Sequence, residues 1–450
     1  MSPGRVVVVG GGLAGIAAAF GCREAGHEVT LLETRSRLGG ATYSFRRGEL
    51  TVDTGQHVFL RCYSEYTELL RRLGTADRVR IQPRLRVPVV TPRARWTLRR
   101  NGLPAPAHLM PALFGHRALS PRERIAAART ALALRTLDPN DPELDSTDFA
   151  SWLRSRGEPR AAVTGLWELF CTAALNARPE HASLASAVKV FRTGMLDTTT
   201  GGDIGIIERP LGEVHGDAAH TALCAAGVTV LPRNKVSGIH GEFGDYRVRA
   251  SEGGRDHEIA ADAVVLAVPN IAAAKLLRDS QRYEHGGQAL ERAPIVNIHV
   301  HVEDPVTDLP MAAALDSPVQ WLFDRTAAAG ADRGQYLVVS LSAAQELIEA
   351  PSARLRAEYL PALENLFPAI RRSRVLDFFV TREPAATFLP APGTRRLRPP
   401  AETEYPGLVL AGAWTDTGWP DTLEGAVRSG NAAARTVVRA MDSLPSAAWR

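Results

Sequence analysis

The chain has 450 residues, of which 45% are hydrophobic and 23% charged, and its formal net charge is only +4. This composition is that of an ordinary soluble globular protein, and the length favours two structural domains. No compact basic run is interleaved with aromatic residues, and the four cysteines show no metal-ligand spacing, so we expect neither a nucleic-acid partner nor a metal site. No stretch has the roughly 18 apolar residues of a spanning helix, which favours a cytoplasmic protein that is at most peripheral to a membrane.

The first predicted element is a strand over residues 5–9, RVVVV, because a short continuous apolar run is typical of a parallel strand buried on both faces. Gly10, Gly12 and Gly15 follow in G-x-G-x-x-G order, and a helical stretch comes after them. In a dinucleotide-binding turn the first glycine permits the tight bend, the second lets a pyrophosphate approach, and the third lets helix pack on strand. The pattern therefore predicts a dinucleotide site.

The helix and the strand that follow this turn complete the predicted site. We expect the backbone N–H groups around Leu13 and Ala14, at the helix N-terminus, to face the phosphates. The second strand, HEVTLLE, ends at Glu33, which is placed to accept a hydrogen bond from a ribose hydroxyl. An acid at this position also argues against the 2′-phosphate of NADP.

Residues 33–45, ETRSRLGGATYSF, resemble the E-x-R-x-R-x-G-G-R segment of the flavin amine oxidase and phytoene desaturase superfamily. The matching residues are Arg35, Arg37, Gly39 and Gly40, whereas Ala41 replaces the last arginine. The resemblance implies FAD as the cofactor, with the two glycines letting the chain cross close to its pyrophosphate.

Two further pieces belong to the same predicted nucleotide domain, residues 227–270 with three short apolar strands and residues 406–440. The resemblance implies that the backbone of Val236 faces the adenine. Two long interruptions predict a second, discontinuous domain. The expected fold is α/β and flavin amine oxidase-like: a Rossmann-type FAD-binding domain of residues 1–80, 205–275 and 400–442, and an α+β substrate domain of residues 81–204 and 276–399.

A helix is predicted over residues 120–137, SPRERIAAARTALALRTL, with arginines beside an apolar face. These arginines are Arg122, Arg124, Arg129 and Arg135. Two interpretations stay open at this point. The helix is either a solvated helix packed on its own domain or a surface that contacts a membrane peripherally.

Near the C-terminus, residues 407–412 predict a strand, and DTLE predicts a helix start with Asp421 as the N-cap residue and Glu424 at the third helical position. Glycines inside a helix cost about 1 kcal/mol each against alanine. Because Gly425 and Gly430 lie in this helix, we expect a flat group, the flavin ring, to approach it closely. The residues expected to contact the cofactor here are Thr422, Leu423, Gly425 and Ala426.

Residues 411–430, AGAWTDTGWPDTLEGAVRSG, resemble the C-terminal signature A-G-D-W-T-D-T-G-x-P-x-T-x-E-G-A-V-x-S-G of the hydroxysqualene dehydroxylases of hopanoid biosynthesis, also called squalene-associated FAD-dependent desaturases. Ala413 replaces the acid of that signature. The resemblance implies FAD-dependent reductive removal of the allylic hydroxyl of hydroxysqualene, giving squalene. It also implies an apolar isoprenoid substrate and contact with other enzymes of squalene biosynthesis.

Such a reaction needs a proton donor for the departing hydroxyl. The candidates are His57, in TGQHV, and Asp416, in WTDTG. For each a structural role is the alternative: Asp416 as a turn-capping aspartate and His57 as a histidine that packs under the flavin without titrating.

Aromatic side chains are the candidates for substrate binding. Trp167 and Phe170 line an apolar channel or belong to the core. Trp414 and Trp419 flank the turn before the last helix, where aromatic faces favour a cation-like transition state.

Two other activities fit the resemblance. One is FAD-dependent desaturation or oxidation of another isoprenoid or of an amine. An amine oxidase needs an aromatic cage and often a lysine near the flavin, and Lys189, Lys235 and Lys275, the only lysines, lie outside the motifs. The other is a non-catalytic prenyl-lipid carrier on the same fold.

Overall fold

Five parallel strands form the sheet that carries the fingerprint turn, in a computed structural model that describes residues 4–279 and 286–443. Their order is β10 (Thr229–Pro232), β2 (Glu28–Glu33), β1 (Arg5–Val9), β14 (Ala263–Leu266) and β20 (Leu408–Leu410). Val6 and Val8 of β1 pack into one core and Val7 and Val9 into another. The central strand is therefore covered on both faces, which explains its continuous apolar run.

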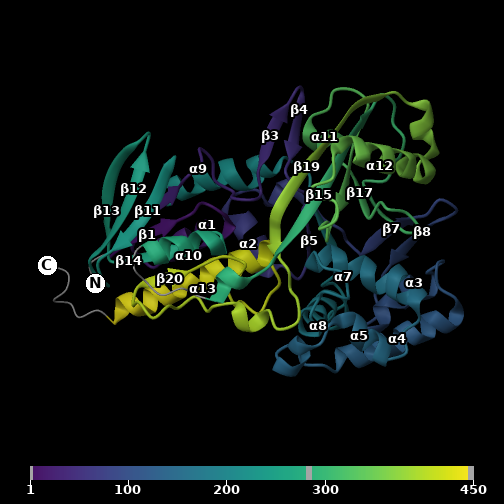
Figure 1. Ribbon diagram of the computed structural model, residues 1–450, viewed down its shortest axis with the longest axis horizontal. Helices are drawn as coiled ribbons and strands as arrows, with labels where there is room; N and C mark the ends of the chain where they lie inside the picture. Colours follow the sequence, from purple (N-terminus) through teal and green to yellow (C-terminus); the bar gives the residue numbers. More distant parts are fainter. Residues whose placement is uncertain (1–3, 280–285, 444–450) are drawn as a thin grey trace.

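Helices cover one face of this sheet and a small antiparallel sheet covers the other (Figure 1). The helices are α1 (Leu13–Glu24), α2 (Ser64–Arg72), α9 (Ala218–Ala225) and α13 (Leu423–Asp442). The opposite face carries β11 (Asn234–His240), β12 (Tyr246–Glu252), β13 (Arg255–Ala261) and α10 (Asn270–Asp279). Residues 227–270 thus contain five strands rather than the expected three, because Arg233, with a φ of 60°, separates β10 from β11 and the largely polar β13 also pairs.

A second sheet has seven strands that come from both interruptions of the first. Its order is β19 (Val375–Phe388), β15 (Arg292–Val302), β18 (Gln335–Leu341), β17 (Trp321–Asp324), β16 (Met311–Ala314), β7 (Arg86–Val90) and β8 (Arg95–Arg99). Helix α12 (Ser352–Leu366) packs on it through Leu355, Tyr359 and Leu363.

Five further helices belong to a separate layer, at the lower right of Figure 1. They are α3 (Met110–Phe114), α4 (Pro121–Arg135), α5 (Phe149–Ser155), α7 (Glu168–Leu175) and α8 (Leu184–Phe191). Helix α4 matches the helix predicted over 120–137, and Ser120 and Glu123 form a capping box at its start.

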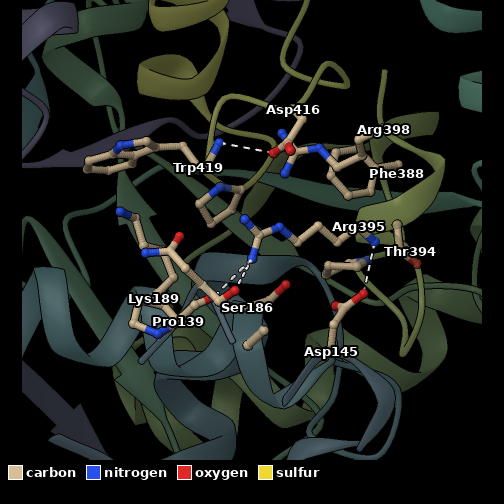
Figure 2. Close-up of a pocket in the computed structure, with 15 residues that line it drawn as sticks. Pro139, Asp145, Ser186, Lys189, Phe388, Thr394, Arg395, Arg398, Asp416 and Trp419 are labelled. Carbon is tan, nitrogen blue, oxygen red and sulfur yellow. Dashed lines mark hydrogen bonds between the residues drawn. The ribbon is translucent and has the colours of Figure 1, made fainter. Parts of the chain in front are cut away.

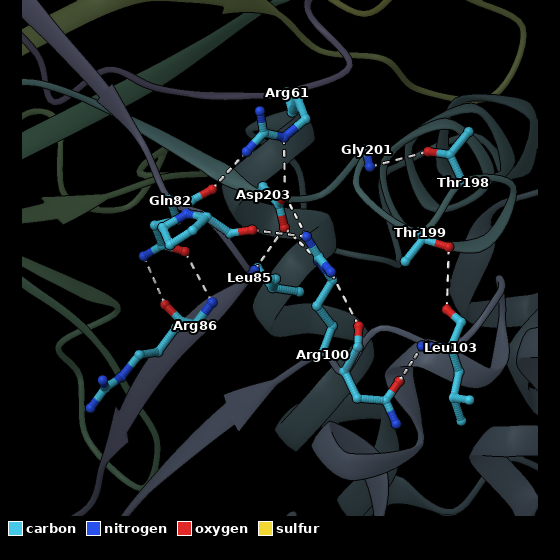
Figure 3. A network of polar contacts seen from close by, with 12 residues as sticks. Arg61, Gln82, Leu85, Arg86, Arg100, Leu103, Thr198, Thr199, Gly201 and Asp203 are labelled. Atoms are coloured by element: carbon cyan, nitrogen blue, oxygen red, sulfur yellow. Dashed lines mark hydrogen bonds and ion pairs between the residues drawn. The ribbon is translucent and has the colours of Figure 1, made fainter.

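A fully buried carboxylate joins the small sheet β5 (Val58–Leu60), β9 (Ile204–Ile207) and β6 (Val79–Ile81) to β7 and β8 (Figure 3). Asp203 accepts from Arg100 at 2.6 and 2.8 Å, from Arg61 at 3.0 Å and from the Leu85 N–H at 2.7 Å. The proposed domain limits after residues 80, 204 and 275 fall inside β6, β9 and α10, and residues 1–3 and 280–285 lie outside the described chain. The exact limits therefore stay a prediction.

Candidate functional site

The fingerprint turn between β1 and α1 has the backbone that its glycines predict. Gly10 has a φ of 109°, which side chains with a Cβ rarely adopt, and a Cβ on Gly15 would overlap the Gly10 carbonyl oxygen. A Cβ on Gly12 would have only the Gly40 Cα within 4 Å, at 3.8 Å. The turn is closed around Gly10 and Gly15 and open above Gly12, where the pyrophosphate is expected.

Helix α1 presents an uncapped N-terminus to this opening. No side chain accepts from its first turn, and the turn contains no acidic residue. The first N–H groups of a helix have no acceptor within it, and the helix dipole adds positive charge there. Leu13 and Ala14 start this turn, so the structure fits the phosphate contacts expected of their backbone.

A second glycine loop lies against the first. Gly39 donates to the Gly11 carbonyl at 2.8 Å, and a Cβ on Gly40 would come within 2.9 Å of the Gly12 Cα. Gly39 and Gly40 have φ values of 95° and 58°. The loop therefore crosses close to the turn, as the resemblance implies.

The arginines beside this loop have different contacts. The Arg37 guanidinium lies 3.4 Å from the centre of the Tyr43 ring and donates to the Gly40 carbonyl at 3.2 Å. The Arg35 side chain is exposed, with its guanidinium 5.8 Å from the same ring. Arg37 thus supports the glycine loop, while Arg35 extends from the rim of the site.

The carboxylate of Glu33 lies at the turn. One oxygen accepts from the Gly11 N–H at 2.8 Å and the other from the Arg35 N–H at 2.7 Å. Each oxygen keeps a lone pair for the predicted ribose contact. Strand β10 places Pro232 opposite Glu33, and the buried Val236 follows on β11, close to the same strand end.

Helix α13 begins one residue later than the sequence indicates. Its N-cap residue is Thr422, whose hydroxyl accepts from the Gly425 N–H at 3.1 Å. Asp421 instead accepts from the Phe388 N–H at 3.0 Å. Glu424 is the second helical residue and accepts from two N–H groups at the start of α2, at 2.8 and 3.2 Å. The predicted cap was wrong for two reasons. Threonine also caps helices well, and the carboxylates of Asp421 and Glu424 bond to other parts of the chain instead.

Protein contacts explain the glycines of α13. A Cβ on Gly425 would overlap the Pro420 carbonyl oxygen, and a Cβ on Gly430 would overlap the carbonyl oxygen of Ala14 on α1. The expectation that a flat ring explains these two glycines was therefore wrong.

Helices α1 and α13 run side by side in the same direction, because Ala14 lies against Gly430 and, further along, Gly21 lies against Ala434. Helix α13 starts at Leu423, about 10 Å before Gly430 at a rise of ~1.5 Å per residue. The N-termini of α1 and α13 thus point in the same direction, and that of α13 lies about 10 Å beyond that of α1 along the helix axes. This arrangement suits a ligand with a pyrophosphate at one point and an electron-accepting ring further along.

The segment TGQHV follows β4 (Leu50–Asp53), and buried contacts hold it in place. Asp53 accepts from Arg325 at 2.8 Å. The Asn297 side-chain N–H donates to the Thr54 carbonyl at 3.1 Å, while its buried Oδ1 has no hydrogen-bond partner in the described chain. An unpaired buried oxygen beside this segment is consistent with a polar group of a bound ligand.

The segment carries the imidazole of His57, and the imidazole of His215 lies near it. Burial lowers the pKa of His57 below its usual 6.5. The pKa of His215 is lowered to about 3 by burial and by the neighbouring charge of His57. The Tyr66 hydroxyl and His215 Nε2 are 2.8 Å apart, and His215 Nδ1 is buried without a partner in the described chain. Both rings are mainly neutral at pH 7, so His57 is a poor proton donor there.

A pocket of about 540 Å³, open solvent included, lies between the helical layer and the C-terminal motif (Figure 2). Its charged lining residues are Asp145, Lys189, Arg395, Arg398 and Asp416. Charged side chains line this pocket, whereas Trp167 and Phe170, which we expected at an apolar channel, are not among its lining residues. It also brings Lys189 next to the motif, which the sequence order does not indicate.

Asp416 is exposed at this pocket and stabilises a turn. Its carboxylate accepts from the Gly418 N–H at 3.3 Å, and its own N–H donates to the Pro399 carbonyl at 2.8 Å. The contacts match the turn-capping alternative, because both of them hold the backbone of the turn.

Asp421, which the sequence analysis treated only as a helix cap, is the more protected acid. Burial raises the pKa of its carboxyl group to about 6, although the Phe388 N–H and the nearby Arg398 favour the charged form. It directly precedes Thr422, the N-cap of α13. A carboxyl group with a pKa near the working pH suits general acid catalysis.

Trp167 is a core residue rather than a channel residue. Its side chain is 2% exposed, packs on Phe149 and Phe191, and donates to Glu158 at 2.9 Å. Phe170 is only partly buried and lies between the hydrophobic cluster of the helical layer and a cluster formed mainly by strand residues, so a channel role stays a prediction for it.

Trp414 is likewise part of the core, because its indole N–H donates to the Val268 carbonyl at 3.0 Å and the ring packs beside β14. Trp419 lines the pocket, but Lys189 and Arg428 lie over its ring, at 5.0 and 4.7 Å from the centroid, and Tyr63 meets it edge-on. Protein cations thus already occupy the aromatic surface that we expected to face the substrate.

The sequence model of the flavin containing amine oxidoreductases matches residues 13–438. The chain belongs to this family. It is therefore an FAD-dependent oxidoreductase, and the open turn at Gly12 and the two aligned helix N-termini fit FAD. In the described residues, no group of three or more His, Cys, Asp and Glu could hold a metal ion.

Similar proteins include enzymes with different reactions. The chain is 29% identical over 442 residues to the hydroxysqualene dehydroxylase of Rhodopseudomonas palustris, covering 97% of this chain and 98% of that one. It is 25% identical over 493 residues to the zeta-carotene desaturase of a Synechocystis species, covering 98% and 99%. The solved cyclohexylamine oxidase of Brevibacterium oxydans superposes with a TM-score of 0.72 at 19% identity, covering 98% and 100%, which shows the shared fold.

Several residues of the site in this oxidoreductase escaped sequence reasoning. His215 and Lys189 come from segments without a motif, and Asn297 and Arg398 lie in stretches that resemble the family but were given no role. Asp421 lies in the C-terminal motif, but the sequence does not distinguish a helix N-cap aspartate from an aspartate shielded from water. Within residues 4–279 and 286–443, no helix combines the length and apolar character needed to cross a bilayer.

Proposed function

We propose that this oxidoreductase removes the allylic hydroxyl of hydroxysqualene by reduction, giving squalene and water. The observation that carries the proposal is the partly buried side chain of Asp421, which accepts from the Phe388 N–H and stands directly before the N-cap of α13. A hydroxyl leaves readily only when it is protonated, so the reaction needs an acid at this point. The similarity to a hydroxysqualene dehydroxylase over nearly the whole chain supports the substrate class.

When bound, reduced FAD supplies the hydride and both electrons for the new C–H bond. The Asp421 carboxyl group gives its proton to the hydroxyl as the C–O bond breaks, so that water leaves. The Phe388 N–H holds the carboxyl group in place, and the guanidinium of Arg398 stabilises the carboxylate that remains. Asp421 then regains a proton from solvent.

The start of α13 has an electrostatic role in this proposal. Its first N–H groups and the helix dipole stabilise negative charge, which suits the anionic form of a reduced flavin. The Thr422 hydroxyl accepts only from the Gly425 N–H, so the N–H groups of Leu423 and Glu424 stay available to a ligand.

Desaturation of a carotenoid is the second candidate, and the 25% identity to a zeta-carotene desaturase favours it. Desaturation removes hydride from the substrate and therefore needs oxidised FAD, whereas dehydroxylation needs reduced FAD. The redox state that supports turnover thus separates the two reactions.

The test uses the FAD-loaded protein without oxygen in two arms. One arm holds dithionite-reduced protein with hydroxysqualene and the other holds oxidised protein with zeta-carotene, and mass spectrometry identifies the products. We expect squalene from the reduced arm alone. A desaturated product from the oxidised arm without squalene would replace the proposal with a desaturase. Retention of either ligand without product would indicate a prenyl-lipid carrier.

A further inference from the structure

Large exposed hydrophobic side chains gather on one part of the surface. In the described residues, five of the seven such side chains come from residues 103–132, with exposed fractions of 48 to 53%. They are Leu103, Met110, Phe114, Ile125 and Leu132. Exposed apolar side chains that cluster in this way mark an interaction surface more often than isolated ones do.

Helix α4 contributes a stripe that alternates arginine with a large apolar residue. Arg122, Ile125, Arg129 and Leu132 follow the spacing of one helix face, and all four are exposed. The other side of α4 buries Ala127, Thr130 and Leu134. The stripe therefore points away from the helical layer.

Helix α3 extends this surface. Arg124 donates to the carbonyl groups of Phe114 and His116, at 2.6 and 2.9 Å, and so ties the end of α3 to the first turn of α4. Figure 1 shows both helices at the outer edge of the helical layer, far from the parallel sheet. On the inner side of α3, Leu109 and Leu113 pack into the cluster around Trp167.

The charge of this surface is strongly biased. Residues 101–136 contain five arginines and one acid, Glu123, which is bonded to Ser120 in the capping box. Among the described residues, Arg122 and Arg129 form no ion pair. Two copies of this face would bring arginine against arginine, which disfavours a symmetric dimer. A surface that is both apolar and negatively charged would match it.

We propose that the α3–α4 face, comprising Met110, Phe114, Ile125 and Leu132 with Arg122 and Arg129, docks on an anionic lipid bilayer. The apolar side chains enter the boundary between headgroups and acyl chains, and the arginines bind the phosphates. The docking does not depend on which isoprenoid the active site accepts.

The test is flotation of the FAD-loaded protein with vesicles of phosphatidylcholine, with or without about a third phosphatidylglycerol. We expect binding to the anionic vesicles that weakens with salt, and at least about tenfold weaker binding to neutral ones. Ile125→Glu with Leu132→Glu should lower binding by about tenfold or more, and Arg122→Gln with Arg129→Gln should remove the preference for anionic vesicles.

Ile271→Glu is the matched control, because Ile271 is 42% exposed on α10, outside this surface, and its variant should bind as the unmodified protein does. Unchanged FAD content and circular dichroism show that each variant is folded, and the arginine pair tests the proposal even if the glutamate pair does not fold. The proposal is overturned if the unmodified protein does not float with the anionic vesicles. It is also overturned if both pairs of variants bind these vesicles as strongly as the unmodified protein does. If the unmodified protein is a dimer without lipid and the Ile125→Glu, Leu132→Glu variant is a monomer, the face is an interface with a second copy instead.

Discussion

The carboxyl groups of Asp416 and Asp421 lie in different environments although both belong to the C-terminal motif. Asp416 is exposed, whereas Asp421 is partly buried and desolvation raises the pKa of its carboxyl group to about 6. We predict that Asp421→Asn keeps FAD bound but lowers the squalene formed per bound FAD by about 10²–10⁴-fold, the usual effect of removing a general acid. An asparagine still accepts the Phe388 N–H, so the local structure should persist.

Asp416→Asn is the matched control and should stay within about threefold of the unmodified protein in turnover per bound FAD. If Asp416→Asn shows the large loss and Asp421→Asn does not, Asp421 is not the acid. Turnover is measured as squalene per bound FAD, which separates chemistry from loss of the cofactor.

The titration of Asp421 has its own signature in the pH dependence. The acid form is needed, so turnover should fall as pH rises through about 6, by about tenfold per unit above it. The folded-state pKa is raised above the ordinary 3.8, so protonation contributes stability that is complete below pH 3.8 and is lost through pH 6. Asp421→Asn should therefore unfold at a higher temperature than the unmodified protein at pH 8 and not at pH 4. An identical shift at both pH values would contradict the burial of this carboxyl group.

At this scale the sequence predicted residue types better than roles. Gly10, Gly15, Gly39 and Gly40 were predictable because each has a backbone conformation or a contact that only glycine allows. Asp416 was chosen over Asp421 because burial cannot be read from neighbours in sequence. The core positions of Trp167 and Trp414 could not be decided from the sequence for the same reason.

At the scale of elements, the contact between α1 and α13 fixes where the two helix N-termini lie. Gly430→Ala would place a Cβ against the Ala14 carbonyl oxygen. An ordinary helical Gly→Ala change stabilises by about 1 kcal/mol, whereas we expect this one to destabilise by about 1–3 kcal/mol and to weaken FAD retention. Gly102→Ala, where a Cβ would meet no atom within 4 Å, is the control for denaturant unfolding. A Gly430→Ala protein of equal or greater stability would show that the helices are not in close contact.

Most elements were predictable where the signal is local. The β1–α1–β2 unit, α4 and β20 follow from apolar periodicity, turn glycines and caps. The missed elements have weaker local signals: β13 is largely polar, and the break at Arg233 depends on a left-handed residue that is not glycine. The start of α13 was one residue off because Asp421 and Thr422 are both good caps.

At the scale of the whole molecule, one buried ion pair ties the small sheet of β5, β6 and β9 to the second sheet (Figure 3). Asp203→Ala should cost about 3–5 kcal/mol, because the Arg100 guanidinium, 6% exposed, would lose its buried countercharge. Glu303→Gln, which breaks the exposed pair with Arg374, should leave denaturant unfolding unchanged. Equal effects of the two changes would mean that the buried pair does not join the sheets.

The assembly of the two sheets from distant segments was predictable only through the resemblance. Nothing local indicates that β20 lies beside β14, or that β7 pairs with β16 across more than two hundred residues. The pocket could not be predicted for the same reason, because the segments that line it, 139–145, 185–189, 388–398 and 416–420, meet only in the folded chain.

The most direct measurement of the central claim is a single turnover of the reduced, FAD-loaded protein with hydroxysqualene in the absence of oxygen. Flavin absorbance follows reoxidation while quenched samples give the squalene formed. We predict that the flavin is reoxidised at the rate at which squalene appears, in equimolar amounts. A flavin that stays reduced while hydroxysqualene remains unchanged would contradict reductive dehydroxylation by this protein.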